Sequence, residues 1–427
     1  MNKEICQAYI EILKSELIPA LGCTEPGAIA YASAKAAEVL GAFPEHIEIK
    51  CSGNIIKNVK GVVVPNSGGL RGIEAAAVLG AIAGKRGAEN ELEVLHRITE
   101  EDIRETSKLL KQDFCKCTLQ EGESNLYIEV SAVCADHQAQ IIVKDSHTNI
   151  VLIKKDGELL FEKDMQGDGG RLEEKKKLLN VKDIIDFADT VNLEEVKDIL
   201  SYQIHVNTAI AEEGLTNEYG ASVGKTLLES YGNDIKVRAK AKAAAGSDAR
   251  MGGSSMPVVI NSGSGNQGIT VSVPVVEYAK ELGADQEQMY RALLISNLLS
   301  IHIKKYIGRL SAFCGAVSAA CGSGAAITYL YGGNFEAISS TIVNTIGNVG
   351  GIVCDGAKAS CAAKIASSLD AAIMAHNMTA QNRKFQKGEG IITDDIEKTI
   401  ENIGYIGREG MKETDTGILH LMLGNKY

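Results

Sequence analysis

The 427-residue sequence contains no tryptophan, and aromatic residues make up only 5% of it. Glycine, in contrast, occurs 44 times. Helices without large side chains can approach one another closely, and glycine permits tight turns. We therefore expect closely packed helices of small residues and many tight turns. The hydrophobic content of 45% is ordinary for a globular enzyme.

The sequence also lacks the features of a nucleic-acid-binding or an exported protein. Its net charge is −11, so neither nucleic acid nor an anionic membrane would be attracted to it. Residues 1–5 contain no apolar signal core, and nothing in them points to export. We therefore expect a cytoplasmic protein with a small-molecule substrate. A homodimer is one assembly that the sequence leaves open.

One stretch, residues 311–334, contains no charged residue. An uncharged run of this length raises the question of a membrane-spanning helix. The run is built from alanine, glycine, serine and cysteine rather than from leucine, isoleucine and phenylalanine. We therefore expect a helix buried in the protein core, and no contact with a membrane.

The pattern of apolar residues predicts an α+β fold, in which a small antiparallel-sheet α/β domain lies beside a larger, mostly α-helical one. Apolar residues recur at helical spacing over 3–17, and a second helix runs from Thr24, its expected N-cap, to Leu40. Strand patterns begin at residue 46, and Val62–Val64 form a further apolar run before a glycine turn. The other expected elements are helices over 73–83 and 100–111 and an antiparallel meander over 115–120, 126–135, 138–144 and 150–155.

A glycine-rich linker over 166–170 separates the meander from a mostly helical remainder. We therefore divide the chain into three parts. Residues 1–45 hold the N-terminal helices and the turn with Cys23, residues 46–165 form the sheet domain, and residues 166–427 form the helical domain.

Ten cysteines in a chain without export features favour metal binding or catalysis over disulfides. Cys314, Cys354 and Cys361 stand in glycine-rich, nearly uncharged sequence, which suits an iron–sulfur cluster held by soft thiolate ligands. We expect Cys354 in the loop before a helix that carries Cys361 in its early turns. The N-terminus of that helix would favour the negative charge of a cluster. Cys321, seven residues after Cys314, repeats the spacing of the other pair.

Cys23 lies in the turn Gly22-Cys23-Thr24-Glu25-Pro26, at the entry to the second expected helix. Such a position lowers the pKa of a thiol and makes a thiolate more available. The five remaining cysteines read as core or half-buried residues: Cys6, Cys51, Cys115, Cys117 and Cys134.

The sequence resembles the L-cysteine desulfidase family, whose relatives include the iron–sulfur L-serine dehydratase alpha chain. The resemblance rests on the spacing Cys314-x39-Cys354-x6-Cys361 and on five short motifs. These motifs are Pro19–Pro26, Gly53–Asn58, Pro65–Gly68, Ala244–Ser247 and Asn261–Gly265. It implies that the three late cysteines hold a 4Fe-4S cluster and that Cys23 is catalytic, as the base or as a displaceable fourth ligand. The implied reaction releases hydrosulfide from L-cysteine and leaves pyruvate and ammonia.

The substrate carboxylate needs anchors of its own, and two loops offer backbone N–H groups and asparagine side chains. The candidates are Asn66, Ser67 and Gly68 in the first loop, Asn261, Ser262, Gly263, Ser264 and Asn266 in the second, and the cations Lys305 and Arg309. Three alternatives remain open. The chain could dehydrate L-serine, it could be a pyridoxal phosphate enzyme, or Cys321 could complete a non-enzymatic four-cysteine metal or sensor site.

Overall fold

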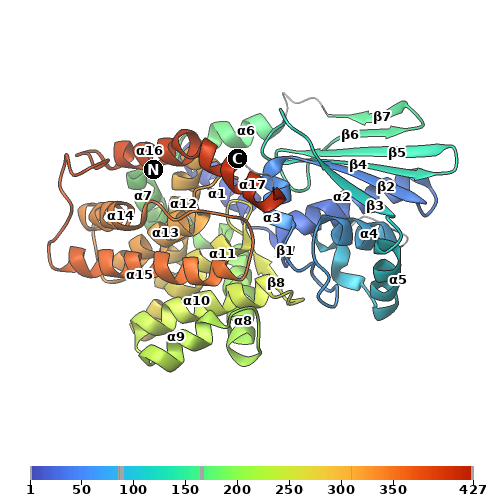
Figure 1. Cartoon of the computed structure of the whole chain (residues 1–427). Helices are drawn as coiled ribbons and strands as arrows, with labels where there is room; N and C mark the ends of the chain where they lie inside the picture. Colours follow the sequence, from blue (N-terminus) through green and yellow to red (C-terminus); the bar gives the residue numbers. More distant parts are fainter. Residues whose placement is uncertain (1, 85, 87–90, 164–167, 309, 425–427) are drawn as a thin grey trace.

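A computed structural model of the chain places a six-stranded sheet at one end of the molecule and a bundle of helices at the other (Figure 1). The structure describes residues 2–84, 86, 91–163, 168–308 and 310–424. The expected α+β fold is confirmed, with a small sheet region beside a larger helical one. Among the described helices, none is both long and apolar enough to span a membrane.

The sheet is mostly antiparallel, and its strand order is β3-β2-β4-β5-β6-β7. In β2, Ile47 and Ile49 are buried whereas Glu48 and Lys50 are exposed, because neighbouring residues of a strand face opposite sides of the sheet. The strands are β2 (His46–Cys51), β3 (Cys115–Leu119), β4 (Tyr127–Cys134), β5 (His137–Lys144), β6 (Ile150–Lys155) and β7 (Glu158–Glu162).

The sheet differs from the predicted meander in three respects. β3 pairs in parallel with β2 instead of opening the meander. The prediction omits β7, an edge strand whose five residues are all exposed. Val62–Val64, predicted as a strand, contributes only an isolated bridge between Val63 and Arg71, because the chain turns back at once and leaves no room for a ladder.

Small residues bring the helices beneath the sheet into close contact, as expected. Helices α2 (Thr24–Leu40) and α4 (Ile73–Gly84) pack against each other, and α2 also contacts β4 and β5 (Figure 1). A Cβ atom at Gly80 would lie 2.2 Å from the carbonyl oxygen of Ala30, so this approach requires glycine. The remaining helices of this end are α3 (Gly53–Val59), η1 (Glu91–Arg97) and α5 (Glu100–Leu110).

The bundle is built around the uncharged helix α13 (Gly315–Leu330), which is buried from Ala316 to Thr328 and contacts α11, α12, α14 and α15. The buried helix predicted within 311–334 is thereby confirmed. The other helices are α1 (Lys3–Glu16), α6 (Asp168–Lys176), α7 (Val181–Thr190), η2 (Leu193–Glu195), α8 (Lys197–Thr216), α9 (Val223–Tyr231), α10 (Ile235–Met251), α11 (Gly265–Glu281), α12 (Gln286–Ile307), α14 (Phe335–Val349), α15 (Ser360–Ala380), α16 (Ile396–Tyr405), η3 (Ile406–Gly410) and α17 (Lys412–Leu423).

Two of the contacts between the sheet end and the bundle help to position the site. β1 (Pro19–Leu21) pairs antiparallel with β8 (Pro257–Val259), which brings the turn with Cys23 close to the second glycine-rich loop. Near the C-terminus, α17 packs on α3. The predicted linker over 166–170 is helical from residue 168, and residues 166–167 lie outside the described part of the chain. The three-part division of the chain stays a prediction.

Candidate active site

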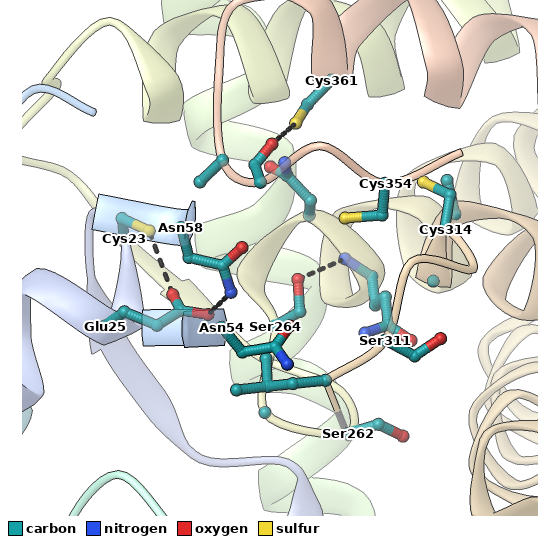
Figure 2. Close-up of a pocket in the computed structure, with 18 of the residues that line it drawn as sticks. Cys23, Glu25, Asn54, Asn58, Ser262, Ser264, Ser311, Cys314, Cys354 and Cys361 are labelled. Carbon is teal, nitrogen blue, oxygen red and sulfur yellow. Dashed lines mark hydrogen bonds between the residues drawn. The ribbon is translucent and has the colours of Figure 1, made fainter. Parts of the chain in front are cut away.

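A cavity of about 110 Å³ opens where the turn before α2, helix α3 and the first residues of α11, α13 and α15 meet. Cys23, Cys314, Cys354 and Cys361 all line it, and Figure 2 shows Cys23 across the cavity from Cys314 and Cys354. The fold thus brings together the four cysteines that the sequence singles out. Cys321 lies instead in the buried core of the bundle and does not line the cavity, which argues against a four-cysteine site that includes it.

Backbone hydrogen bonds place Cys314 beside Cys354. The N–H of Cys314 donates to the carbonyl of Ile352 at 3.0 Å, and the N–H of Cys354 donates to the carbonyl of Ala312 at 2.6 Å. These bonds flank an antiparallel bridge between the two cysteine loops. The two thiols interact, and this interaction raises the pKa of Cys314 and lowers that of Cys354. Of the two, Cys354 is therefore the residue prepared to bind as a thiolate.

Cys361 is the second residue of α15, and Cys354 lies in the loop before that helix, as predicted. The Sγ atom of Cys361 accepts from the N–H of Lys358 at 3.4 Å and donates to the carbonyl of Gly356 at 3.6 Å. Gly356 has a φ of +97°, and a Cβ atom there would lie 2.3 Å from the carbonyl oxygen of Lys57. The loop between the two cysteines therefore depends on a glycine that touches α3.

Cys23 is the N-cap residue of α2, a position that the sequence prediction gives to Thr24. It is buried, and its Sγ atom donates to the Oε2 atom of Glu25 at 3.1 Å. Burial and the Glu25 carboxylate hold the pKa of the Cys23 thiol well above its usual range. The structure corrects the expectation of a thiolate here, because these two effects outweigh the helix N-terminus.

Glu25 forms a buried carboxylate at the centre of this wall of the cavity. Its Oε1 atom accepts from Asn58 at 3.0 Å, and its Oε2 atom also accepts from Thr24 at 2.9 Å. The Nε2 atom of His147 lies 3.9 Å from Oε1, too far for a hydrogen bond but close enough for attraction between charges. Burial alone would raise the pKa of Glu25, but His147 and the donors around it lower that pKa to about 2.

Positive charge surrounds the rest of the cavity. Helices α2, α11, α13 and α15 all begin at its wall, and the N-terminus of a helix carries partial positive charge. Two buried lysines, Lys57 and Lys304, also line it. Lys57 pairs with Asp415 of α17. Burial lowers the pKa of Lys304 to about 8. The cavity therefore suits a ligand with negative charge.

Comparison with known proteins agrees with this chemistry. A family model described as the serine dehydratase alpha chain matches residues 89–420, which is more than half of the sequence. The chain belongs to the serine dehydratase alpha-chain family. Membership supports a lyase of the iron–sulfur dehydratase type, although the match does not fix the type of cluster.

The chain is also similar to curated relatives over nearly its whole length. A UPF0597 protein of Lachnoclostridium phytofermentans is 54% identical over 97% of this chain and 99% of its own. Those of Desulfitobacterium hafniense and Finegoldia magna are 51% and 50% identical, over 98% and 97% of this chain and 96% and 99% of their own. Their names state no activity, so the comparisons leave the substrate open.

The thiols of this serine dehydratase alpha-chain family member fit a cluster better than a single ion. Among the described residues, no three His, Cys, Asp or Glu side chains converge closely enough to hold one metal ion. In an iron–sulfur cube each thiolate binds a different iron atom, so its ligands lie farther apart. Three thiols on one cavity, with lysines and helix N-termini to balance charge, provide the required donor set.

The predicted substrate contacts divide into three groups. Ser262, Gly263, Ser264 and Asn266 line the cavity, and Asn261 lies behind them, hydrogen-bonded to Asn297. Asn66, Ser67 and Gly68 do not line it: Asn66 donates to the carbonyl of Leu95, and Ser67 donates to that of Leu70. Lys305 donates to the carbonyls of Lys176 and Leu179, away from the cavity, and Arg309 lies outside the described residues.

Sequence reasoning missed several residues of the cavity wall. Glu25 lies in the turn Gly22–Pro26, two residues after Cys23, and this proximity in the sequence could have identified it as a site residue. Nothing in the sequence distinguishes His147 or Arg250, because a single histidine or arginine has no pattern. The other polar wall residues missed are Asn54, Lys57, Asn58, Gln267, Lys304 and Ser311, of which the first three lie in the motif Gly53–Asn58.

Proposed function

We propose that the protein is an L-cysteine desulfidase that depends on a 4Fe-4S cluster. The reaction breaks the Cα–H and Cβ–S bonds of L-cysteine and gives hydrosulfide and 2-aminoacrylate. The latter becomes an imine and takes up water, which yields pyruvate and ammonia. One observation carries the proposal: Cys314, Cys354 and Cys361 line one cavity, and Cys23 lies across it from Cys314 and Cys354.

Cys314, Cys354 and Cys361 would hold the cluster, and three protein ligands leave one of the four iron atoms open. When bound, the cluster supplies that iron as a Lewis acid toward the substrate sulfur. The protein contributes the surrounding charge. Lys57 and Lys304 and the helix N-termini stabilise thiolate ligands that would otherwise be costly to bury.

Cys23 is the proposed acid–base residue. Its thiol donates to Glu25, and this hydrogen bond fixes the sulfur at the wall of the cavity. Asn58 and Thr24 hold the Glu25 carboxylate in place, and the Nε2 atom of His147 lies 3.9 Å from its Oε1 atom. Cys23 would release its thiol proton to solvent before the elimination and, as a thiolate, would accept the Cα proton. Glu25 is a positioning residue in this scheme, because it acts through Cys23.

The loop over Ser262–Ser264 would contribute to substrate binding at the start of α11. Its residues line the cavity, and Ser264 caps the helix through the N–H of Gln267. Asn261 supports the loop from behind through Asn297 and Ser300. Backbone N–H groups at a helix start are suited to an anionic group of the substrate.

An iron–sulfur L-serine dehydratase is the second candidate, and the description of the matching family favours it. The same cavity and acid–base pair would eliminate water from L-serine instead of hydrosulfide from L-cysteine. The turn Gly22–Pro26 and the spacing of the late cysteines, on which the resemblance rests, support L-cysteine.

Side-by-side turnover of the two amino acids separates the candidates. The protein is loaded anaerobically with iron and sulfide, freed of excess sulfide, and assayed for sulfide and pyruvate with L-cysteine and with L-serine. We expect equal amounts of sulfide and pyruvate from L-cysteine, and neither from Cys354→Ala. The matched control Cys321→Ala should keep both products. A fully loaded protein that makes pyruvate only from L-serine would establish the second candidate, and one that acts on neither would refute both.

A further inference from the structure

Arg250, the second-last residue of α10, is an unusual cation in the wall of the cavity. It is 2% exposed, and its Nε atom has no hydrogen-bond partner. Among the described residues, no carboxylate lies within ion-pair distance of its guanidinium group. The charge of arginine persists at any physiological pH, and a buried charge without a partner is costly. The guanidinium group therefore has no direct ion-pair partner among the described residues, and the carboxylate of Glu25 in the same cavity acts on it only at longer range.

The surroundings fix the guanidinium at the start of α11. A Cβ atom at Gly265 would lie 2.3 Å from the Nε atom of Arg250, so the missing side chain makes room for the cation. The N-terminus of α11 adds partial positive charge at the same place. Both features increase the attraction of this corner for an anionic group.

The same cavity holds hydrogen-bond acceptors without donors. Twelve buried side-chain atoms of the described residues lack a partner, and five of them belong to residues that line this cavity. Three of the five are amide oxygens, which accept hydrogen bonds and attract cations. The five are Arg250 Nε, His147 Nε2, Asn54 Oδ1, Asn266 Oδ1 and Gln267 Oε1.

We propose that Arg250 binds the α-carboxylate of the substrate and that Asn266 and Gln267 bind its α-ammonium group through their amide oxygens. A guanidinium without an ion-pair partner and amide oxygens without donors complement a zwitterion, so the ligand class is a free α-amino acid. Neither a peptide nor a simple thiol carries both groups. The inference rests on the proposed function for the identity of the reacting atoms, but not for the binding of the two charged groups.

A structural role is the main competitor, because Arg250 could simply balance the charge of a bound cluster. The two roles predict different effects of the ligand's carboxylate on binding. A carboxylate-binding arginine distinguishes ligands with and without a carboxylate, whereas a charge-balancing arginine affects cluster loading and treats both ligands alike.

Three small thiols test the inference on the anaerobically loaded protein, with dissociation constants measured by calorimetry. α-Methyl-L-cysteine has both charged groups and no Cα proton, so it is not consumed. Cysteamine lacks the carboxylate, and 3-mercaptopropionate lacks the ammonium group. In the wild type, loss of the carboxylate should weaken binding about 10- to 100-fold, the range of a hydrogen-bonded charge.

In Arg250→Gln, the ratio of the dissociation constants of cysteamine and α-methyl-L-cysteine should fall close to one. The ratio for 3-mercaptopropionate and α-methyl-L-cysteine, which measures the loss of the ammonium group, should keep its wild-type value. Asn266→Leu and Gln267→Leu should show the opposite pattern. Arg104→Gln, at an exposed arginine of α5, is the matched control and should keep the wild-type ratios.

The inference would be overturned if the ratio of the dissociation constants of cysteamine and α-methyl-L-cysteine were the same in Arg250→Gln as in the wild type, with or without a loss of iron. If Arg250→Gln does not fold by circular dichroism, Arg250→Lys, which keeps the charge but not the fork of donors, should reduce the ratio in part. A ratio at the wild-type value in Arg250→Lys would then contradict the proposal. Absence of sulfide from L-cysteine in the wild type would refute the desulfidase assignment alone, because the binding ratios do not depend on turnover.

Discussion

Gly356 offers a sharp test of how the cysteine loop is held. Its φ of +97° strains any residue with a side chain, at a cost of about 1–3 kcal/mol. A Cβ atom at 2.3 Å from the carbonyl oxygen of Lys57 also forces overpacking, which costs another 1–3 kcal/mol or so. We expect Gly356→Ala to lower the free energy of unfolding of the cluster-free protein by about 2–6 kcal/mol, unless the loop moves away from α3. Such a movement would displace Cys354 and reduce the bound iron.

Two measurements on the variant therefore cover both responses: urea unfolding of the cluster-free protein, and iron content after anaerobic loading. Gly351→Ala is the matched control, because this exposed glycine lies in the same loop and has no positive φ, and a Cβ atom added to it would have no neighbour within 4 Å. The control should change neither quantity. If Gly356→Ala matched Gly351→Ala in both, the reasoning about close contact between the loop and α3 would be refuted.

Three further predictions concern the cysteines and two carboxylates. Cys23→Ala should retain iron but lose sulfide production from L-cysteine by about 10²-fold or more, whereas Cys321→Ala should retain both in the same iron and sulfide assays. Burial raises the pKa of Asp248 to about 6, so the folded protein keeps a proton that the unfolded chain loses near pH 4. The contribution of Asp248 to the free energy of unfolding should therefore fall by about 2–3 kcal/mol as the pH rises from 4 to 6, and urea unfolding should show this change as a difference between the wild type and Asp248→Asn. Asp415→Ala leaves the buried lysine of α3 unpaired and should destabilise the protein by about 1–3 kcal/mol in the same assay, with Glu413→Ala on the exposed side as control.

The regular elements of the fold were largely predictable, because apolar spacing records which face of an element is buried. The helices over 3–16 and 24–40 and the uncharged helix α13 lie where the pattern places them. Pairing partners were less predictable. β3 joins β2 in parallel, and no local pattern distinguishes that neighbour from β4. β7 is exposed throughout and has no alternation by which to predict it.

The candidate site was predictable where it depends on residue type and spacing, as for the four cysteines. It was not predictable where it depends on the absence of a partner. Arg250 matters because it is buried and forms no ion pair with any described residue, and only the folded chain reveals that. Cys23 is a second example, since burial and the carboxylate of Glu25 raise the pKa of its thiol, and its place at the helix N-terminus alone predicts the opposite shift.

The ion pair between Lys57 and Asp415 has a consequence for the order of events during biosynthesis. A ribosome makes Cys23 and Lys57 roughly 300 residues or more before Cys354, Cys361 and Asp415. A nascent polypeptide therefore has no complete chamber in which iron and sulfide could be assembled. The wall of the cavity is therefore complete only once α17 has been made, and a change in α17 would reach the cavity through Lys57.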